Sequence, residues 1–90
     1  MVHERLTPEQ VEAAVRDEVA RQDATYGPFD ASVGSMRLAV AYLQDESAEC
    51  FEAWQKWKRR PDWFRLRGEA IQLAAVAYRL VRDVEVELVD

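Results

Sequence analysis

Apolar residues recur every three or four positions through three long stretches of this chain, which is the pattern of amphipathic helices. In the first stretch, valine or alanine occupies positions 11, 14, 15 and 19, and charged residues lie between them. Thr7 precedes Pro8, and Gln10 follows, which is the arrangement of a helix cap with a capping box. We therefore predict a helix over residues 8–23, preceded by a loose N-terminus over residues 1–7.

A second helix is predicted from residue 32 or 35 to residue 57, and a third from residue 62 or 63 to residue 82. Arg60-Pro61 separates them, and so short a turn makes the two helices antiparallel. Each has a seam of positions spaced alternately by four and three, as in a helix bundle. The seam of the second helix is Met36, Val40, Leu43, Ser47, Cys50, Trp54 and Trp57. The seam of the third is Leu66, Ala70, Leu73, Ala77, Leu80 and Val84.

The predicted fold is all-α, a helical hairpin plus an N-terminal helix, in a single domain over residues 1–90. Gln72 is the only polar residue between positions 71 and 78, and a helix so apolar is expected to be buried by a second subunit. A chain of 90 residues is also marginal alone. We therefore expect a homodimer or homotetramer built as a four-helix-type bundle. The alternating tail, residues 84–90, is open to three interpretations: a strand, a frayed helix end or a segment exchanged between protomers.

Composition narrows the function classes. The formal charge of −5 argues against nucleic acid as a partner, and no apolar run is long enough to cross a membrane. Cys50 has no partner for a disulfide, and the N-terminal residues lack a signal-peptide core, so a cytoplasmic protein is expected. Cys50 is interpreted as a small core residue, and His3 lies in the loose terminus. The basic cluster between Lys56 and Arg67 fits either a solvated turn or an anion-binding patch.

The second and third helices carry the candidate chemistry. Glu46 and Glu49 are neighbours on one face of the second helix, on a stripe beside the seam that also holds Ala39, Tyr42 and Ala53. Glu69 and Gln72 have the same spacing on the third helix, and the antiparallel hairpin lets the carboxylates converge. Converging carboxylates repel one another unless a cation lies between them. Mg²⁺ prefers such oxygen ligands, and helix bundles build carboxylate metal sites in this way.

The whole pattern resembles the MazG-like family of all-α nucleoside triphosphate pyrophosphohydrolases, in its small bacterial and phage-type subgroup. The family signature is E-E-x-x-E, a spacer, and E-x-x-D; here Asp45-Glu46-x-x-Glu49 and Glu69-x-x-Gln72 are separated by 19 residues. The loop Tyr26-Gly27-Pro28-Phe29-x-Ala31-Ser32 and residues 67–77 are also similar to that subgroup, so the likeness spans residues 24–83.

The resemblance implies hydrolysis of a nucleotide to a monophosphate and pyrophosphate, with Mg²⁺, or Mn²⁺ in the same site, as the required metal. By position, Glu46, Glu49, Glu69 and Gln72 are the expected metal ligands, and Asp45 with Glu46 the catalytic pair. Candidate substrate contacts are Lys56, Arg59 and Arg67 for phosphate and Tyr26, Phe29 and Trp54 for the base. Two departures weaken the expected activity, because Gln72 replaces an aspartate and Asp45 a glutamate. The alternative is a noncatalytic module on the same scaffold that binds a nucleotide or a protein.

Overall fold

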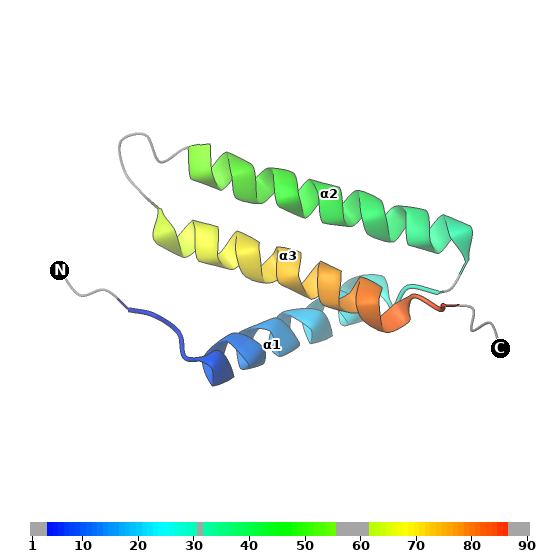
Figure 1. Cartoon of the computed structure of the whole chain (residues 1–90), viewed down its shortest axis with the longest axis horizontal. Helices are drawn as coiled ribbons and strands as arrows, with labels where there is room; N and C mark the ends of the chain where they lie inside the picture. The colour runs from blue at the N-terminus through cyan, green and yellow to red at the C-terminus, as the bar shows by residue number, and fades with distance from the viewer. Residues whose placement is uncertain (1–3, 31, 56–61, 87–90) are drawn as a thin grey trace.

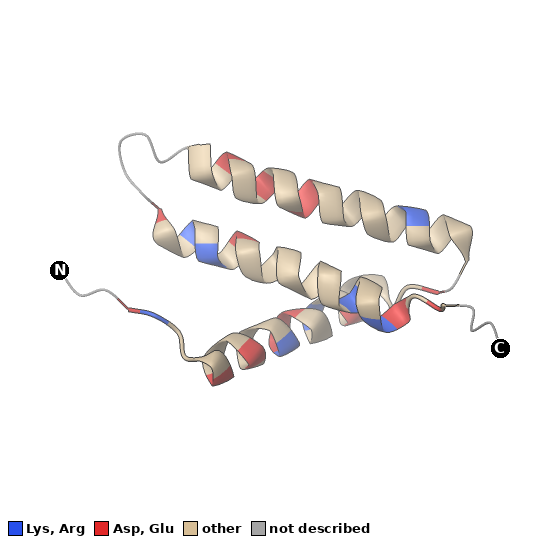
Figure 2. Cartoon of the chain, viewed as in Figure 1, with Lys and Arg blue, Asp and Glu red and all other residues tan. Residues whose placement is uncertain are grey.

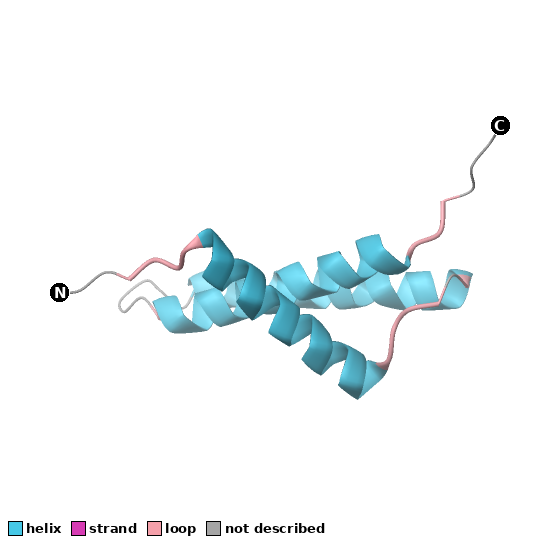
Figure 3. Ribbon diagram, turned by 90° about the horizontal axis from the view of Figure 1, so that it is seen from below, coloured by secondary structure: helices cyan, strands magenta, loops and turns pink. Residues whose placement is uncertain are grey.

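The computed structural model describes residues 4–30, 32–55 and 62–86, and it has three helices: α1 (Pro8–Tyr26), α2 (Val33–Gln55) and α3 (Trp63–Asp83). Helices α2 and α3 form an antiparallel hairpin, and α1 crosses α3 at an angle (Figures 1 and 3). The backbones of α1 and α2 both pack on α3 and not on one another. The described residues contain no strand, which confirms the predicted all-α class.

Local hydrogen bonds explain where the helices begin. At α1, the backbone N–H of Gln10 donates to Thr7 Oγ1 at 3.2 Å, and that of Thr7 donates to Gln10 Oε1 at 2.8 Å, so the predicted capping box is confirmed. Asp62 caps α3 by accepting a hydrogen bond from the backbone N–H of Arg65 at 2.9 Å. The helix bounds therefore follow from short polar side chains placed just before each apolar stretch.

The ends of the helices differ partly from the prediction. Helix α1 continues to Tyr26, three residues past the predicted end at residue 23. It stops at Gly27, whose φ of 77° is a conformation that glycine adopts without strain, and whose N–H donates to the carbonyl oxygen of Asp23 at 2.8 Å. Residues 84–86 of the C-terminal tail are neither helix nor strand, and residues 87–90 lie outside the described residues, as does the predicted end of α2 at residue 57.

The predicted seam of α2 is not the face that this helix buries most within the chain. Val40 is 46% exposed and Trp54 is 55% exposed, whereas Ala39 and Ala53 of the neighbouring stripe are buried. The small side chains on that stripe let α3 approach α2 closely. The stripe is therefore the face of α2 that packs on α3, in preference to the seam of larger residues. Met36, Leu43 and Cys50 of the seam are half-buried, so the seam is only partly buried within the single chain, and the stripe that holds Glu46 faces inward beside it.

The same displacement occurs on α3. Ala70 and Val84 of its predicted seam are exposed, while Val76 and Arg79 are buried. The positions turned inward, at least half-buried and spaced by three and four, are Glu69, Gln72, Val76, Arg79 and Asp83. The interior of the hairpin is thus polar at several levels.

Much apolar surface remains open to solvent. Few apolar residues are buried among the described residues, and most of them are small: Val19, Phe29, Ala39, Ala53, Ala75 and Val76. The accessible surface is 7290 Å², whereas a folded monomer of this mass exposes about 5400 Å². No helix in the described residues combines the length and the apolar character that a membrane crossing requires.

A buried arginine fastens α1 and the following loop to α3. The side chain of Arg79 is 1% exposed, and it donates to Asp23 Oδ1 at 2.9 Å, to Gln22 Oε1 at 3.2 Å and to the carbonyl oxygen of Gly27 at 2.6 Å. The guanidinium carbon also lies 4.3 Å from the ring centroid of Phe29. Every one of these partners belongs to the last turn of α1 or to the loop, so Arg79 positions both.

Replacing Arg79 with methionine is expected to lower the free energy of unfolding by about 3 kcal/mol, because Asp23 and the Gly27 carbonyl would lose a buried partner. Arg82→Met is the matched control, since Arg82 also pairs with Asp23 but is 34% exposed; it should cost about 1 kcal/mol or less. Urea unfolding followed by circular dichroism measures both. Equal costs for the two variants would contradict the special role of Arg79.

Candidate carboxylate site between the helices

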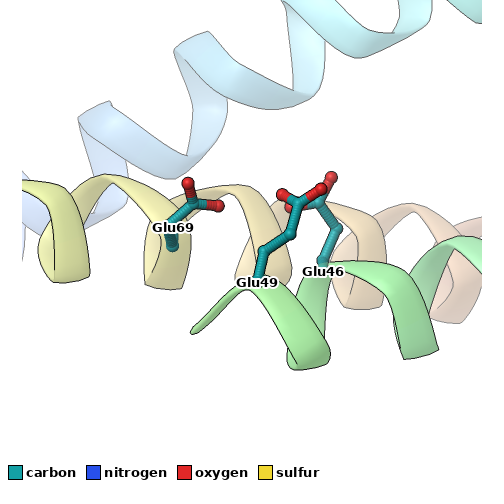
Figure 4. A group of neighbouring side chains, drawn as sticks. All are labelled: Glu46, Glu49 and Glu69. Atoms are coloured by element: carbon teal, nitrogen blue, oxygen red, sulfur yellow. The ribbon is translucent and has the colours of Figure 1, made fainter. Parts of the chain in front are cut away.

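Three carboxylates meet where α2 and α3 face each other. Glu46 and Glu49 come from successive turns of α2, and Glu69 comes from α3; one oxygen of each lies within 4.8 Å of the others (Figure 4). Glu46 and Glu69 are half-buried and Glu49 is exposed. The i, i+3 spacing on α2 and the antiparallel partner helix are sufficient to bring them together.

The site holds more negative charge than its surroundings neutralise. Glu46 Oε2 and Glu69 Oε2 are buried and have no hydrogen-bond partner within the described part of the chain. Burial, followed by the charges of Glu49 and Glu69, raises the pKa of Glu46 to about 7. Burial and a hydrogen-bonding contact with Glu49 raise the pKa of Glu69 as well. Two carboxylates can share such a contact only with a proton or a cation between them, so the site is suited to holding one or the other.

The remaining predicted ligand and the predicted catalytic aspartate flank this group. Gln72 is half-buried one turn beyond Glu69, and its backbone carbonyl accepts a hydrogen bond from Gln22 Nε2 of α1 at 3.3 Å. Asp45 is exposed on α2 beside Glu46 and is not among the three converging carboxylates. Gln72 can offer only a neutral carbonyl oxygen, which fits a magnesium ligand of lower charge than the carboxylates.

Of the three cations predicted to contact phosphate, the structure describes only Arg67. Arg67 donates to the backbone carbonyl of Glu4 at 2.8 Å and thus contacts the N-terminal segment, while Lys56 and Arg59 lie outside the described residues. Arg65 takes the place beside the site: its Nη2 is 3.8 Å from Glu52 Oε1 and its Nε is 4.0 Å from Glu69 Oε1. Figure 2 shows basic and acidic positions near the start of α3, alongside the acidic positions of α2.

The aromatic candidates have unequal access to solvent. The Tyr26 ring is 61% exposed and lies 5.7 Å, centroid to centroid, from the ring of Tyr42. Phe29 is buried, with Arg79 over its face, and its ring centroid is 6.3 Å from that of Tyr42. Trp54 is exposed two turns beyond Glu46 on α2. Tyr26 and Trp54 are therefore the two of the three that are open to solvent, and Tyr26 contacts the carboxylate stripe through Tyr42.

Sequence reasoning missed Arg65 and Tyr42 as site residues, although a signal for each was present. Arg65 precedes Glu69 by four positions and Tyr42 precedes Glu46 by four, so both share a helix face with a carboxylate. Helix α1 also reaches this face of the hairpin, where Gln22 Nε2 donates to the backbone carbonyl of Gln72 at 3.3 Å. No pattern in the sequence ties α1 to the acidic face of the hairpin, because that contact depends on tertiary packing.

Cys50 is half-buried on α2, close to the carboxylates. Burial, then the charges of Glu69, Glu46 and Glu49, raises the pKa of its thiol. A thiol with a raised pKa remains protonated and is a poor nucleophile. This placement agrees with the interpretation of Cys50 as a packing residue; His3 lies outside the described residues.

Comparison of the chain with protein-family models, with curated proteins and with solved structures finds no match. The resemblance to the MazG-like family therefore stays a prediction, which rests on the order and spacing of the acidic residues, on the loop that precedes them and on residues 67–77.

The raised pKa of Glu46 predicts a pH dependence of stability without added metal. The folded state holds this proton up to about pH 7, whereas the ordinary pKa is 4.5, so between these values the folded state binds more protons than the unfolded state. The free energy of unfolding should therefore fall as pH rises, by about 2 kcal/mol between about pH 5 and pH 8. Urea unfolding in the presence of a chelator measures this slope.

Glu46→Gln should remove most of that slope, because its amide does not titrate. Asp45→Asn changes the adjacent exposed carboxylate on the same helix and is expected to leave the slope as it is. A slope that is unchanged in Glu46→Gln would mean that Glu46 is charged in the folded protein throughout this range.

Proposed function

We propose that this chain is a Mg²⁺-dependent nucleotide pyrophosphohydrolase of the MazG-like type, acting in the cytoplasm on a nucleoside triphosphate. The observation that carries the proposal is the meeting of Glu46, Glu49 and Glu69 on facing helices, with a buried and unpartnered oxygen on Glu46 and on Glu69. A divalent cation would relieve the repulsion and supply the missing partners at once. Such a site suits phosphoryl transfer, which depends mainly on positioning and charge neutralisation.

In this proposal a water molecule attacks between the α- and β-phosphates, and the products are a nucleoside monophosphate and pyrophosphate. Bound Mg²⁺ would neutralise phosphate charge and lower the pKa of a coordinated water. Glu46, Glu49 and Glu69 are the proposed metal ligands, and Gln72 adds a neutral oxygen. Asp45 is exposed beside them and is proposed to orient the attacking water or a ligand.

A second candidate function is supported by Gln72 itself. With an amide where the family has an aspartate, the formal charge of the four ligands is −3 rather than −4, so Mg²⁺ should bind less tightly. A scaffold that retains three carboxylates and loses the fourth fits a module that binds a nucleotide or a protein without turnover. The two functions differ in whether pyrophosphate is released.

We also propose that a second copy of the chain covers the outer face of α2, as part of a homodimer or homotetramer with a four-helix-type core. Within one chain the backbone of α2 packs on that of α3 and not on that of α1. The opposite side of α2 carries Leu43, Ser47 and Phe51 around a shallow groove, and Phe51 is 61% exposed. The accessible surface exceeds that of a typical monomer by about 1900 Å², and each partner in a stable dimer buries about 800 Å². The surplus is thus large enough for such an interface.

Pyrophosphate release from a panel of ribo- and deoxynucleoside triphosphates, with Mg²⁺ or Mn²⁺, tests the catalytic proposal. Wild-type protein should release pyrophosphate from at least one nucleotide, and Glu49→Gln should lower the rate about 100-fold or more, because an exposed ligand carboxylate is lost while the shape is kept. The exposed Glu9→Gln on α1 is the control and should retain the wild-type rate.

Gln72→Asp distinguishes a weakened enzyme from a binding module. Restoring the carboxylate should tighten Mg²⁺ binding and raise the rate several-fold if the site is catalytic. A folded wild-type protein and a folded Gln72→Asp variant that both release no pyrophosphate would overturn the hydrolase proposal in favour of the binding module.

The proposed interface predicts that Phe51→Glu shifts the protein toward the monomer, because a charge would be buried against the second copy. Sedimentation velocity at several concentrations measures the shift. Val86→Glu is the control, since Val86 is 74% exposed but lies beyond α3. A wild-type protein that sediments as a monomer at all concentrations would contradict the interface.

A further inference from the structure

The C-terminal half of α1 passes across the side of the hairpin on which the carboxylate oxygens lie (Figure 4). Gln22 Nε2 donates to the backbone carbonyl of Gln72 at 3.3 Å, one turn from Glu69, and also to Glu18 Oε2 at 3.1 Å. The charge of Glu18 contributes to the raised pKa of Glu46. Helix α1 is therefore a third wall of the site, beside α2 and α3.

Arg21 lies on this wall with one edge of its guanidinium held and another free. Its Nε donates to Glu18 Oε1 at 2.6 Å and its Nη2 to Glu18 Oε2 at 2.7 Å. Nη1 has no hydrogen-bond partner among residues 4–30, 32–55 and 62–86, and the side chain is 56% exposed. An arginine fixed by a bidentate pair with donors to spare is already oriented for a phosphate oxygen.

Arg21 has a carboxylate of the site, Glu46, and an aromatic residue, Tyr26, among the groups that affect its charge. The pKa of Arg21 is raised, first by Glu18 and further by the charges of Tyr26 and Glu46, so the guanidinium lies within electrostatic reach of both. Tyr26 contacts Tyr42 at 5.7 Å between ring centroids, and Tyr42 is one helical turn, about 6 Å, from Glu46. Glu18 Oε2 accepts hydrogen bonds from both Arg21 Nη2 and Gln22 Nε2, so the guanidinium lies beside the side chain that contacts the Gln72 carbonyl, one turn from Glu69.

We propose that Arg21 is a substrate-binding residue that contacts a phosphate oxygen at the open side of the carboxylate site. This inference rests on the proposed function, because it takes a polyphosphate to be bound at Glu46, Glu49 and Glu69. Arg65 is less suited to the role, since it already faces Glu52 and Glu69 at 3.8 and 4.0 Å. Arg21 is paired with Glu18, which is not one of the proposed metal ligands. A contact between Arg21 and phosphate therefore takes no ligand from the metal.

The test measures two affinities by calorimetry, that of Mn²⁺ alone and that of the Mn²⁺ complex of inorganic tripolyphosphate, which needs no assumption about the base. Arg21→Gln should bind the tripolyphosphate complex about tenfold more weakly or worse, the loss expected for a charge-assisted hydrogen bond. Its affinity for Mn²⁺ alone should stay within about threefold of wild type, because Arg21 is not a ligand. Arg21→Lys keeps the charge and should recover part of the loss.

Arg16→Gln is the matched control, because Arg16 is an exposed arginine of the same helix that lines the groove between α1 and Tyr78 of α3. It should bind both probes as the wild type does. Equal affinity of wild type and Arg21→Gln for the tripolyphosphate complex, with Mn²⁺ still bound, overturns the role of Arg21 and leaves the proposed function standing. Wild-type protein that binds no Mn²⁺ overturns the proposed function and this inference together.

Discussion

Repulsion among three carboxylates at a helix interface is the constraint on which the rest of this structure depends. Glu46, Glu49 and Glu69 each place an oxygen within 4.8 Å of the others. They are brought together because the small side chains of Ala39 and Ala53 allow α2 to lie close to α3. Like charges so near each other, and partly shielded from water, raise one another's pKa or require a cation. The hairpin thus buries a stripe that works against its own stability, which is common at functional sites and rare elsewhere.

The charges at the other end of the hairpin are compensated. Arg79 is fully buried, yet its guanidinium donates to Asp23, Gln22 and the Gly27 carbonyl, and Arg82 adds a second pair with Asp23 at 2.7 Å. Both interiors are polar, but one has a partner for each charge and the other has unpartnered oxygens. The buried charge of Arg79 has partners in α1 and in the loop that follows, so its role is structural: it holds both in place. Uncompensated burial instead raises the pKa of Glu46 and of Glu69, so this end of the hairpin is suited to holding a proton or a cation.

The sequence was sufficient for the three helices and for the convergence of the acidic residues, because capping residues, helical periodicity and a short turn are local signals. It was misleading about which stripes face inward. Periodicity marks every apolar face alike, whether it is buried within one chain or against a second copy, so Val40 and Trp54 were assigned to an interior that they do not enter. Arg79 was missed for a related reason, since an arginine near the end of a largely apolar helix gives no sign of the four groups that surround it.

The position of α1 links these observations. Arg79 fastens the last turn of α1 to α3, and the neighbouring turn carries Glu18, whose charge contributes to the raised pKa of Glu46, and Gln22, which donates to the backbone carbonyl of Gln72. Were α1 free to swing, the hairpin would retain its acidic stripe but lose its third wall. The network around the fully buried Arg79 guanidinium therefore orients α1 beside the site. It does not enlarge the apolar core. The free energy gained from the Arg79 network offsets the repulsion among Glu46, Glu49 and Glu69, so the folded chain tolerates that repulsion.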